Sequence, residues 1–285
     1  MFGMFKSLTM PAEGESGARQ LLFLSLLCLI AVAMNVSCGT ESRPTILDNP
    51  NYDGWLCFQQ ENVRIYHVPG HPQEANFGNV AAGYKAALNK VCSALNMPVP
   101  EGPIDVVFYT GWGQGREITG EEYPFVKDGV IHFWLPSYLG VTFMHWLLPQ
   151  WIPTEPRHRF LKHGLITVWD YSGNDYHLTL LKFRKAGRFI PLAQLAVDTT
   201  IDSNTERRQS SEAASFVSFV LGNYGPDTLK TMYQSELPFD TLVAYTLGVT
   251  TDSLEQLWVK FAELNVRPEG LKELDEIQPD SAGQQ

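Results

Sequence analysis

Alternating and periodic apolar positions predict three strands and one helix in the first half of the chain. Residues 62–68 alternate between polar and apolar side chains, which is typical of a half-buried strand. Residues 104–109 are almost continuously apolar and predict a central strand, and residues 129–135 predict a third. Between the first two strands, apolar residues recur at helical spacing and predict a helix facing a core: Phe77, Val80, Tyr84, Leu88, Val91 and Leu95.

The second half of the chain has the pattern of a helical layer. Residues 143–148 are apolar and predict the start of one helix, and residues 160–169 predict another. A strongly amphipathic helix is predicted from Glu212 to Gly225. Glycine is typical of a helix end and proline of the first turn of the next helix, so the Gly225–Pro226 pair predicts a break between two helices. Strand–helix–strand–strand followed by helices predicts an α+β fold, with a small mixed sheet in the N-terminal half packed on helices.

Helix caps and loops complete the predicted elements. Asp240 is placed to cap a helix that finishes at Gly248. Asp252 and Glu255 have the spacing of a capping box before the last amphipathic helix. Residues 111–115 are rich in glycine and predict a loop, without the lysine and hydroxyl residue of a phosphate-binding loop.

The amino end has the pattern of an export signal. An apolar run covers residues 21–34, with Lys6 and Arg19 on its amino-terminal side. Small Ser37 precedes Cys38, so the segment resembles a bacterial lipoprotein signal, in which the cysteine is acylated and becomes the first mature residue. Ordinary secretion and an uncleaved anchor are the rival interpretations. All three interpretations place the folded domain outside the cytoplasm. We assign residues 1–37 to the signal and residues 38–54 to a tether.

Composition and charge narrow the class of partner. The chain has 285 residues, 44% of them hydrophobic, and a formal net charge of -10. That length supports a sizeable core, and we expect one domain over residues 55–267 followed by a polar tail at 268–285. Nucleic acid is not an expected partner, because binding phosphates needs clustered Lys and Arg and no basic stripe is present. Cys57 and Cys92 are either a disulfide of an exported protein or two buried thiols.

Three strings in the second half carry a resemblance to a known family. They cover residues 189–195, 212–226 and 247–258. Their order and spacing resemble the gluzincin-type, peptidase MA-like zinc metallopeptidase domains of bacterial exported proteins. The resemblance spans about residues 60–265 and implies a zincin-like fold.

Such domains carry His-Glu-x-x-His on one helix, where residues four apart share a face and bind zinc while the glutamate acts on the metal-bound water. A Trp-Leu-x-Glu-Gly-Leu-like segment downstream supplies the last ligand. Here His145 takes the first histidine's place, Trp146 stands where the base belongs and Pro149 where the second histidine belongs. His163 takes the position of the downstream glutamate. The resemblance therefore predicts a pseudoenzyme that has lost its general base and one metal ligand.

The expected function is therefore binding, or a structural role in the cell envelope, by a lipid-anchored protein that needs no cofactor. The ligand is a peptide, a glycan or a partner protein, and the candidate groove is lined by Trp134, Trp146, Glu155 and Tyr171. The alternative is a divergent zinc-dependent hydrolase, with zinc held by His145, His163 and a third group. Neither a serine nor a cysteine nucleophile is indicated, because no recognisable motif surrounds one.

Overall fold

The computed structural model describes residues 46–134, 139–170, 172–197 and 206–266, together with residues 270, 272 and 274. The described residues from Asn51 onward belong to one compact unit. The predicted signal, Cys38 and Tyr171 lie outside the described residues, as does most of the predicted tail. In the described part of the chain, no helix has both the length and the apolar character needed to cross a membrane.

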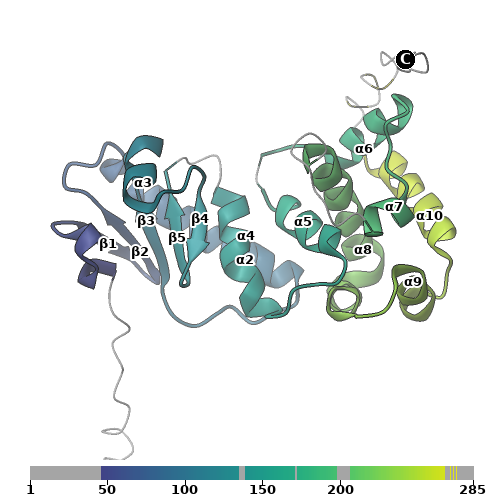
Figure 1. The fold of residues 1–285 in the computed structure, drawn as a ribbon, viewed down its shortest axis with the longest axis horizontal. Helices are drawn as coiled ribbons and strands as arrows, with labels where there is room; N and C mark the ends of the chain where they lie inside the picture. The colour runs from purple at the N-terminus through teal and green to yellow at the C-terminus, as the bar shows by residue number, and fades with distance from the viewer. Residues whose placement is uncertain are drawn as a thin grey trace, which may run out of the picture. The chain divides into compact units, whose positions relative to one another are not determined.

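Five strands form one mixed sheet in the order β1-β2-β3-β5-β4 (Figure 1). They are β1 (Leu56–Gln60), β2 (Val63–His67), β3 (Ile104–Phe108), β4 (Phe125–Lys127) and β5 (Val130–Phe133). The strands β2, β3 and β5 run parallel, whereas β1 and β4 pair antiparallel at the two edges. The three predicted strands are confirmed and β3 is central, but the sequence pattern did not reveal the two short edge strands.

One face of the sheet packs on α2 (Phe77–Ala94) and α4 (Leu139–Trp151). Phe77 of the predicted helix meets Phe108 of β3, and Tyr84 meets Phe143 of α4. The opposite face is covered by aromatic residues ahead of β1, including Trp55, which contacts Tyr109 edge to face. The end of β3 near Tyr109 is therefore buried on both faces, whereas Arg64 and Asp105 on the opposite face stay partly exposed.

The glycine-rich segment is a helix and not the predicted loop. The helix α3 spans Trp112–Thr119, so only Gly111 lies outside it. Gly115 makes the packing here possible, because a Cβ at this residue would lie 2.8 Å from the ring of Trp134. Glycine lowers helix propensity by about 1 kcal/mol, and contact with the buried aromatic layer overrides that local preference.

Six further helices follow α4 in the described chain (Figure 1). They are α5 (Arg159–Thr167), α6 (Tyr176–Lys185), α7 (Leu192–Val197), α8 (Glu206–Gln234), α9 (Phe239–Leu247) and α10 (Thr251–Asn265). The predicted break at Gly225 is confirmed, because its backbone has φ 82° and ψ 171° inside α8. Phe216 is fully buried and contacts Phe160, Phe239 and Trp258, which ties four helices together.

Three local predictions about helix ends are wrong. The cap of α9 is Pro238, and Asp240 instead accepts a hydrogen bond of 2.5 Å from the hydroxyl of Thr251. The cap of α10 is Thr250, whose side chain accepts from the backbone N–H of Ser253. Glu255 is no capping-box partner, because its carboxylate accepts from the N–H of Leu192, at 2.6 Å. Asp240 and Glu255 thus each pair with a partner outside the helix end that sequence spacing assigned to them.

The α+β prediction is confirmed: a mixed sheet occupies the first half and helices the second. The helix α4 begins at Leu139, earlier than predicted, and passes through Pro149 to Trp151. Pro149 lies in the last turn of this helix, and its missing N–H leaves the carbonyl oxygen of His145 without an intrahelical donor.

Candidate functional site

The candidate site lies where α4, which follows β5, meets α5. The helix α4 contacts β4, β5 and α5, and α5 packs along α8. Gly164, next to His163, allows this close approach, because a Cβ there would lie 2.4 Å from the carbonyl oxygen of Ala213. The helix α5, which carries His163, is therefore held tightly against α8 while it also contacts α4, which carries His145.

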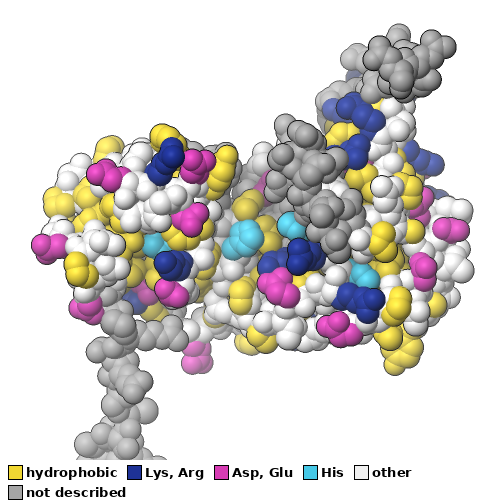
Figure 2. Space-filling view, viewed as in Figure 1, with side chains coloured by type: hydrophobic (Ala, Val, Ile, Leu, Met, Phe, Trp, Pro, Cys, Tyr) yellow, Lys and Arg dark blue, Asp and Glu magenta, His cyan; other side chains and the backbone are white. Residues whose placement is uncertain are grey.

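His145 and His163 lie close enough to influence one another's charge. His145 is exposed on α4 and His163 is half-buried on α5. Protein atoms around the His145 ring withdraw it from water and lower its pKa, and the positive charges of Lys162 and His163 lower it further, whereas Glu155 raises it. Figure 2 shows histidine, basic and acidic side chains gathered on the surface over α4 and α5.

Trp146, at the position where the resemblance would place a general base, is part of the packing. Only 9% of the residue is exposed, and its indole N–H donates a hydrogen bond of 3.1 Å to the carbonyl oxygen of Gly129. Gly129 belongs to the turn between β4 and β5, so the side chain joins α4 to the edge of the sheet. An indole has no acid–base function, and its one polar group is already used.

Pro149 occupies the position of the second histidine with an exposed ring that cannot bind metal. The helix continues past it, because Ile152 donates its N–H to the carbonyl oxygen of Leu148, at 2.9 Å. The side chain of Gln150 reaches back to the carbonyl oxygen of Trp146, at 3.2 Å. The helix α4 is therefore kept at a position whose side chain offers no metal ligand.

Glu155 takes part in an ion pair and not in an open site. Its carboxylate accepts a hydrogen bond of 2.5 Å from Lys162 of α5, and its side chain is 75% exposed. The hydroxyl of Tyr233 is also within its electrostatic reach: burial, with a smaller effect of Glu155, raises the pKa of Tyr233. Lys162 and Glu155 thus border the two histidines with charges that largely cancel.

The predicted groove is not assembled as one surface. Trp134 is buried just after the C-terminal end of β5, where it packs on Gly115 and Tyr109. Trp146 instead donates its hydrogen bond to Gly129, which lies just before the N-terminal end of β5. At about 3.3 Å per strand residue, these contacts lie roughly 15 Å apart. Tyr171 lies outside the described residues. Within the described ranges, no group of three or more His, Cys, Asp or Glu side chains could hold a metal.

The remaining histidines have structural partners. His132 stacks on Phe125 at 4.3 Å and its Nδ1 lies 2.9 Å from the hydroxyl of Tyr109. His177 lies 2.8 Å from the hydroxyl of Ser215, which also accepts from the indole of Trp258. Ser215 is fully buried, so this histidine–serine contact is closed to any substrate.

The two body cysteines are free and lie in different surroundings. Cys57 is exposed on the edge strand β1, and Cys92 is buried in α2. This structure therefore contains no Cys57–Cys92 disulfide. Of the two buried thiols expected in the other case, only Cys92 is buried. Burial raises the pKa of both thiols, which makes them poor nucleophiles near neutral pH.

Two features were not anticipated from sequence. A cavity of about 250 Å³ lies between the turn joining β1 to β2 and the helix α2. A buried carboxylate, Glu212, accepts from the backbone N–H of Ile190 at 3.1 Å inside the helical half. The left-handed residue Glu61 marks the first feature, but no local sequence pattern reveals either one.

Comparison with known proteins adds no relative. No protein-family model, curated protein or solved structure matches the chain.

Proposed function

We propose that the chain is an exported, lipid-anchored protein whose zincin-like domain acts without catalysis, by binding or as a structural component of the cell envelope. The resemblance supplies the scaffold, and the identities at two of the four motif positions, Trp146 and Pro149, remove the general base and one metal ligand. The observation that carries the proposal is the packed state of Trp146. A side chain that is buried and hydrogen-bonded to the sheet edge supports a structural use of the position where a peptidase needs a general base.

The expected loss of activity is large. A general base typically contributes about 10²–10⁴ in rate, and a metal-bound water is activated only when a metal is held with an open position. Pro149 removes one ligand, and the Lys162–Glu155 pair already engages the nearest carboxylate. Because Trp146 fills the space beside the sheet edge, a surface role is better supported than a ligand held inside a groove.

Metal analysis combined with a peptidase assay tests this proposal. We expect dialysed protein to hold far less than one zinc per chain and to leave casein uncut, with or without EDTA. The control is the double variant His145→Ala/His163→Ala, which should be indistinguishable from the natural chain. Stoichiometric zinc that disappears in the double variant, together with cleavage restored by Zn²⁺ after EDTA, would overturn the proposal.

The second candidate is a divergent zinc-dependent hydrolase, and one observation favours it. His145 and His163 come from different helices yet lie within electrostatic range of one another, with Glu155 beside them. Two imidazoles and a carboxylate are ligands that zinc accepts. The carboxylate would first have to leave Lys162, so the metal titration above should include a Lys162→Met variant. Tighter zinc binding by that variant alone would favour this candidate.

Anchoring is tested separately through Cys38. Two acyl chains make membrane attachment stable, because each buried methylene contributes about 0.8 kcal/mol. We expect the Cys38→Ser precursor to remain unprocessed or to leave the membrane fraction. Intact mass spectrometry of membrane-extracted protein measures the mature start and the lipid mass. A trimmed, unlipidated product that stays on the membrane would contradict lipid anchoring without touching the proposal about catalysis.

A further inference from the structure

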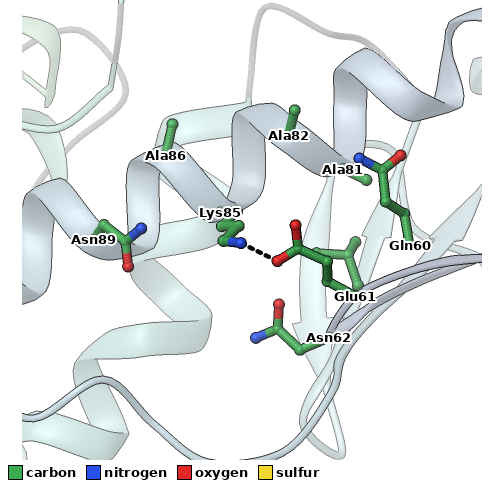
Figure 3. Close-up of a pocket in the computed structure, with 9 residues that line it drawn as sticks. Gln60, Glu61, Asn62, Ala81, Ala82, Lys85, Ala86 and Asn89 are labelled. Carbon is green, nitrogen blue, oxygen red and sulfur yellow. Dashed lines mark hydrogen bonds and ion pairs between the residues drawn. The ribbon is translucent and has the colours of Figure 1, made fainter.

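A hollow beside the first hairpin has the chemistry of a small binding site. It has a volume of about 250 Å³ and is lined by residues 60–63 and by one face of α2. Figure 3 shows Gln60 and Asn89 toward opposite ends of the hollow, with Glu61 and Lys85 between them. None of its lining residues belongs to α4 or α5, so it is separate from the degenerate peptidase site.

Small side chains keep the hollow open. Ala82 and Ala86 lie one turn apart on the solvent side of α2, where longer polar side chains are usual, and Ala81 and Val63 complete the floor. Their methyl groups form an apolar surface under a polar rim. Such a floor suits a ligand that has one face of C–H groups.

The hairpin turn supports the site through an unusual backbone conformation. Gln60 pairs with Val63, so Glu61 and Asn62 form a two-residue turn, and Glu61 has a left-handed φ of 52°. This conformation favours glycine and costs a side chain roughly 1–2 kcal/mol. The strained residue nevertheless carries a carboxylate, which is ion-paired with Lys85 across the hollow. The two-residue hairpin turn requires this conformation, and the Glu61 carboxylate lies opposite Lys85 in it.

The polar rim is rich in amides and electrically neutral. The side-chain amides of Gln60, Asn62 and Asn89 make no hydrogen bond to any residue that the structure describes and are free to meet a ligand. Each amide can both donate and accept hydrogen bonds, as each hydroxyl of a sugar does. The charges of Glu61 and Lys85 cancel, which disfavours phosphates and other ions, and the lining holds no aromatic ring on which a base would stack.

We propose that this hollow binds one uncharged sugar residue. The amides and the Glu61–Lys85 pair would hydrogen-bond its hydroxyls, and the alanine methyls would support its C–H face. The hollow is smaller than drug-sized sites of about 300–1,000 Å³, in keeping with a single ring. A ligand of this size bound at an open surface has an expected Kd of about 1–10 mM.

Saturation-transfer NMR on the purified full-length chain tests this proposal. The probes are methyl glucoside, N-acetylglucosamine and galactose, with glycine as a zwitterion and inorganic phosphate as an anion. At least one sugar should bind saturably in the millimolar range, and glycine and phosphate should not. The proposal is overturned if none of the three sugars binds saturably, or if glycine or phosphate binds in preference to them.

Two sets of variants locate the site. Ala82→Leu/Ala86→Leu fills the floor with good helix formers and should weaken sugar binding at least tenfold. Its matched control is Ala94→Leu, an exposed alanine of α2 that does not line the hollow, and it should bind as the natural chain does. Asn62→Ala and Asn89→Ala should each weaken binding about 2–10-fold, as expected for one lost hydrogen bond. Unchanged binding in the filled variant of confirmed fold excludes this site.

Discussion

Replacing Glu212 by glutamine should stabilise the fold at alkaline pH and leave it unchanged in acid. Glu212 is fully buried on α8, and its carboxyl group accepts from the backbone N–H of Ile190, at 3.1 Å. Its pKa is raised to about 8, chiefly by burial and to a lesser extent by Glu255, while the Ile190 N–H and Arg208 oppose the shift. The folded chain therefore holds a proton between pH 4.5 and about 8 that the unfolded chain has released.

The sign of the pH effect follows from this difference in bound protons. Because the folded pKa is raised, the contribution of Glu212 is most favourable below about pH 4.5 and declines as the pH rises toward 8. At 1.36 kcal/mol per pKa unit, the interval from 4.5 to about 8 corresponds to a loss of at most about 5 kcal/mol. Glutamine resembles the protonated acid in shape and charge and keeps an oxygen for Ile190, so it should escape this loss.

Urea unfolding at pH 4.5, 7 and 9 measures the effect. We expect equal free energies of unfolding at pH 4.5, with Glu212→Gln ahead by about 2–5 kcal/mol at pH 9. The control is Glu263→Gln, which removes an exposed ion pair with Arg184 and should change stability by less than about 1 kcal/mol at every pH. Parallel pH profiles of the natural chain and Glu212→Gln would refute the reasoning.

Three further predictions concern packing and protonation. Gly164→Ala should destabilise the fold by about 1–3 kcal/mol, because its Cβ would meet the backbone of Ala213 at 2.4 Å. The control Gly113→Ala has open space around it and should be neutral or stabilising. Urea unfolding that ranks the two variants in the opposite order would contradict the Gly164–Ala213 contact. Trp146→Phe should lower the free energy of unfolding by about 1–3 kcal/mol, because the Gly129 carbonyl loses its donor and the smaller ring leaves space unfilled. A thermal unfolding midpoint that does not change would show that the indole contributes little to stability. Burial lowers the pKa of His132 to about 4, so stability should fall by up to about 3 kcal/mol as the pH drops from 6.5 to 4. His132→Gln should flatten that decline, and an equally steep acid limb in both proteins would argue against it.

Local pattern was sufficient for the main elements of the fold. The stripe from Phe77 to Leu95 predicted α2 almost to its ends, and the Gly225–Pro226 pair marked the break inside α8. Both are properties of neighbouring residues and need no partner elsewhere. The identities of Trp146 and Pro149 already exclude a general base and a metal ligand at those positions, since side-chain chemistry does not depend on the fold.

Tertiary structure decided what depends on distant partners. The edge strand β4 is too short to predict and β1 too mixed in pattern. Both exist because β2 and β5 offer backbone groups to pair with. Glu255 became a partner of Leu192, because a backbone donor lay within reach across the helical layer. The α2 hollow combines a hairpin turn with a helix that follows it in sequence, and only folding brings Glu61 to Lys85. Sequence determined which groups the chain carries, and packing determined which of them meet, because burial and contact are properties of the whole fold.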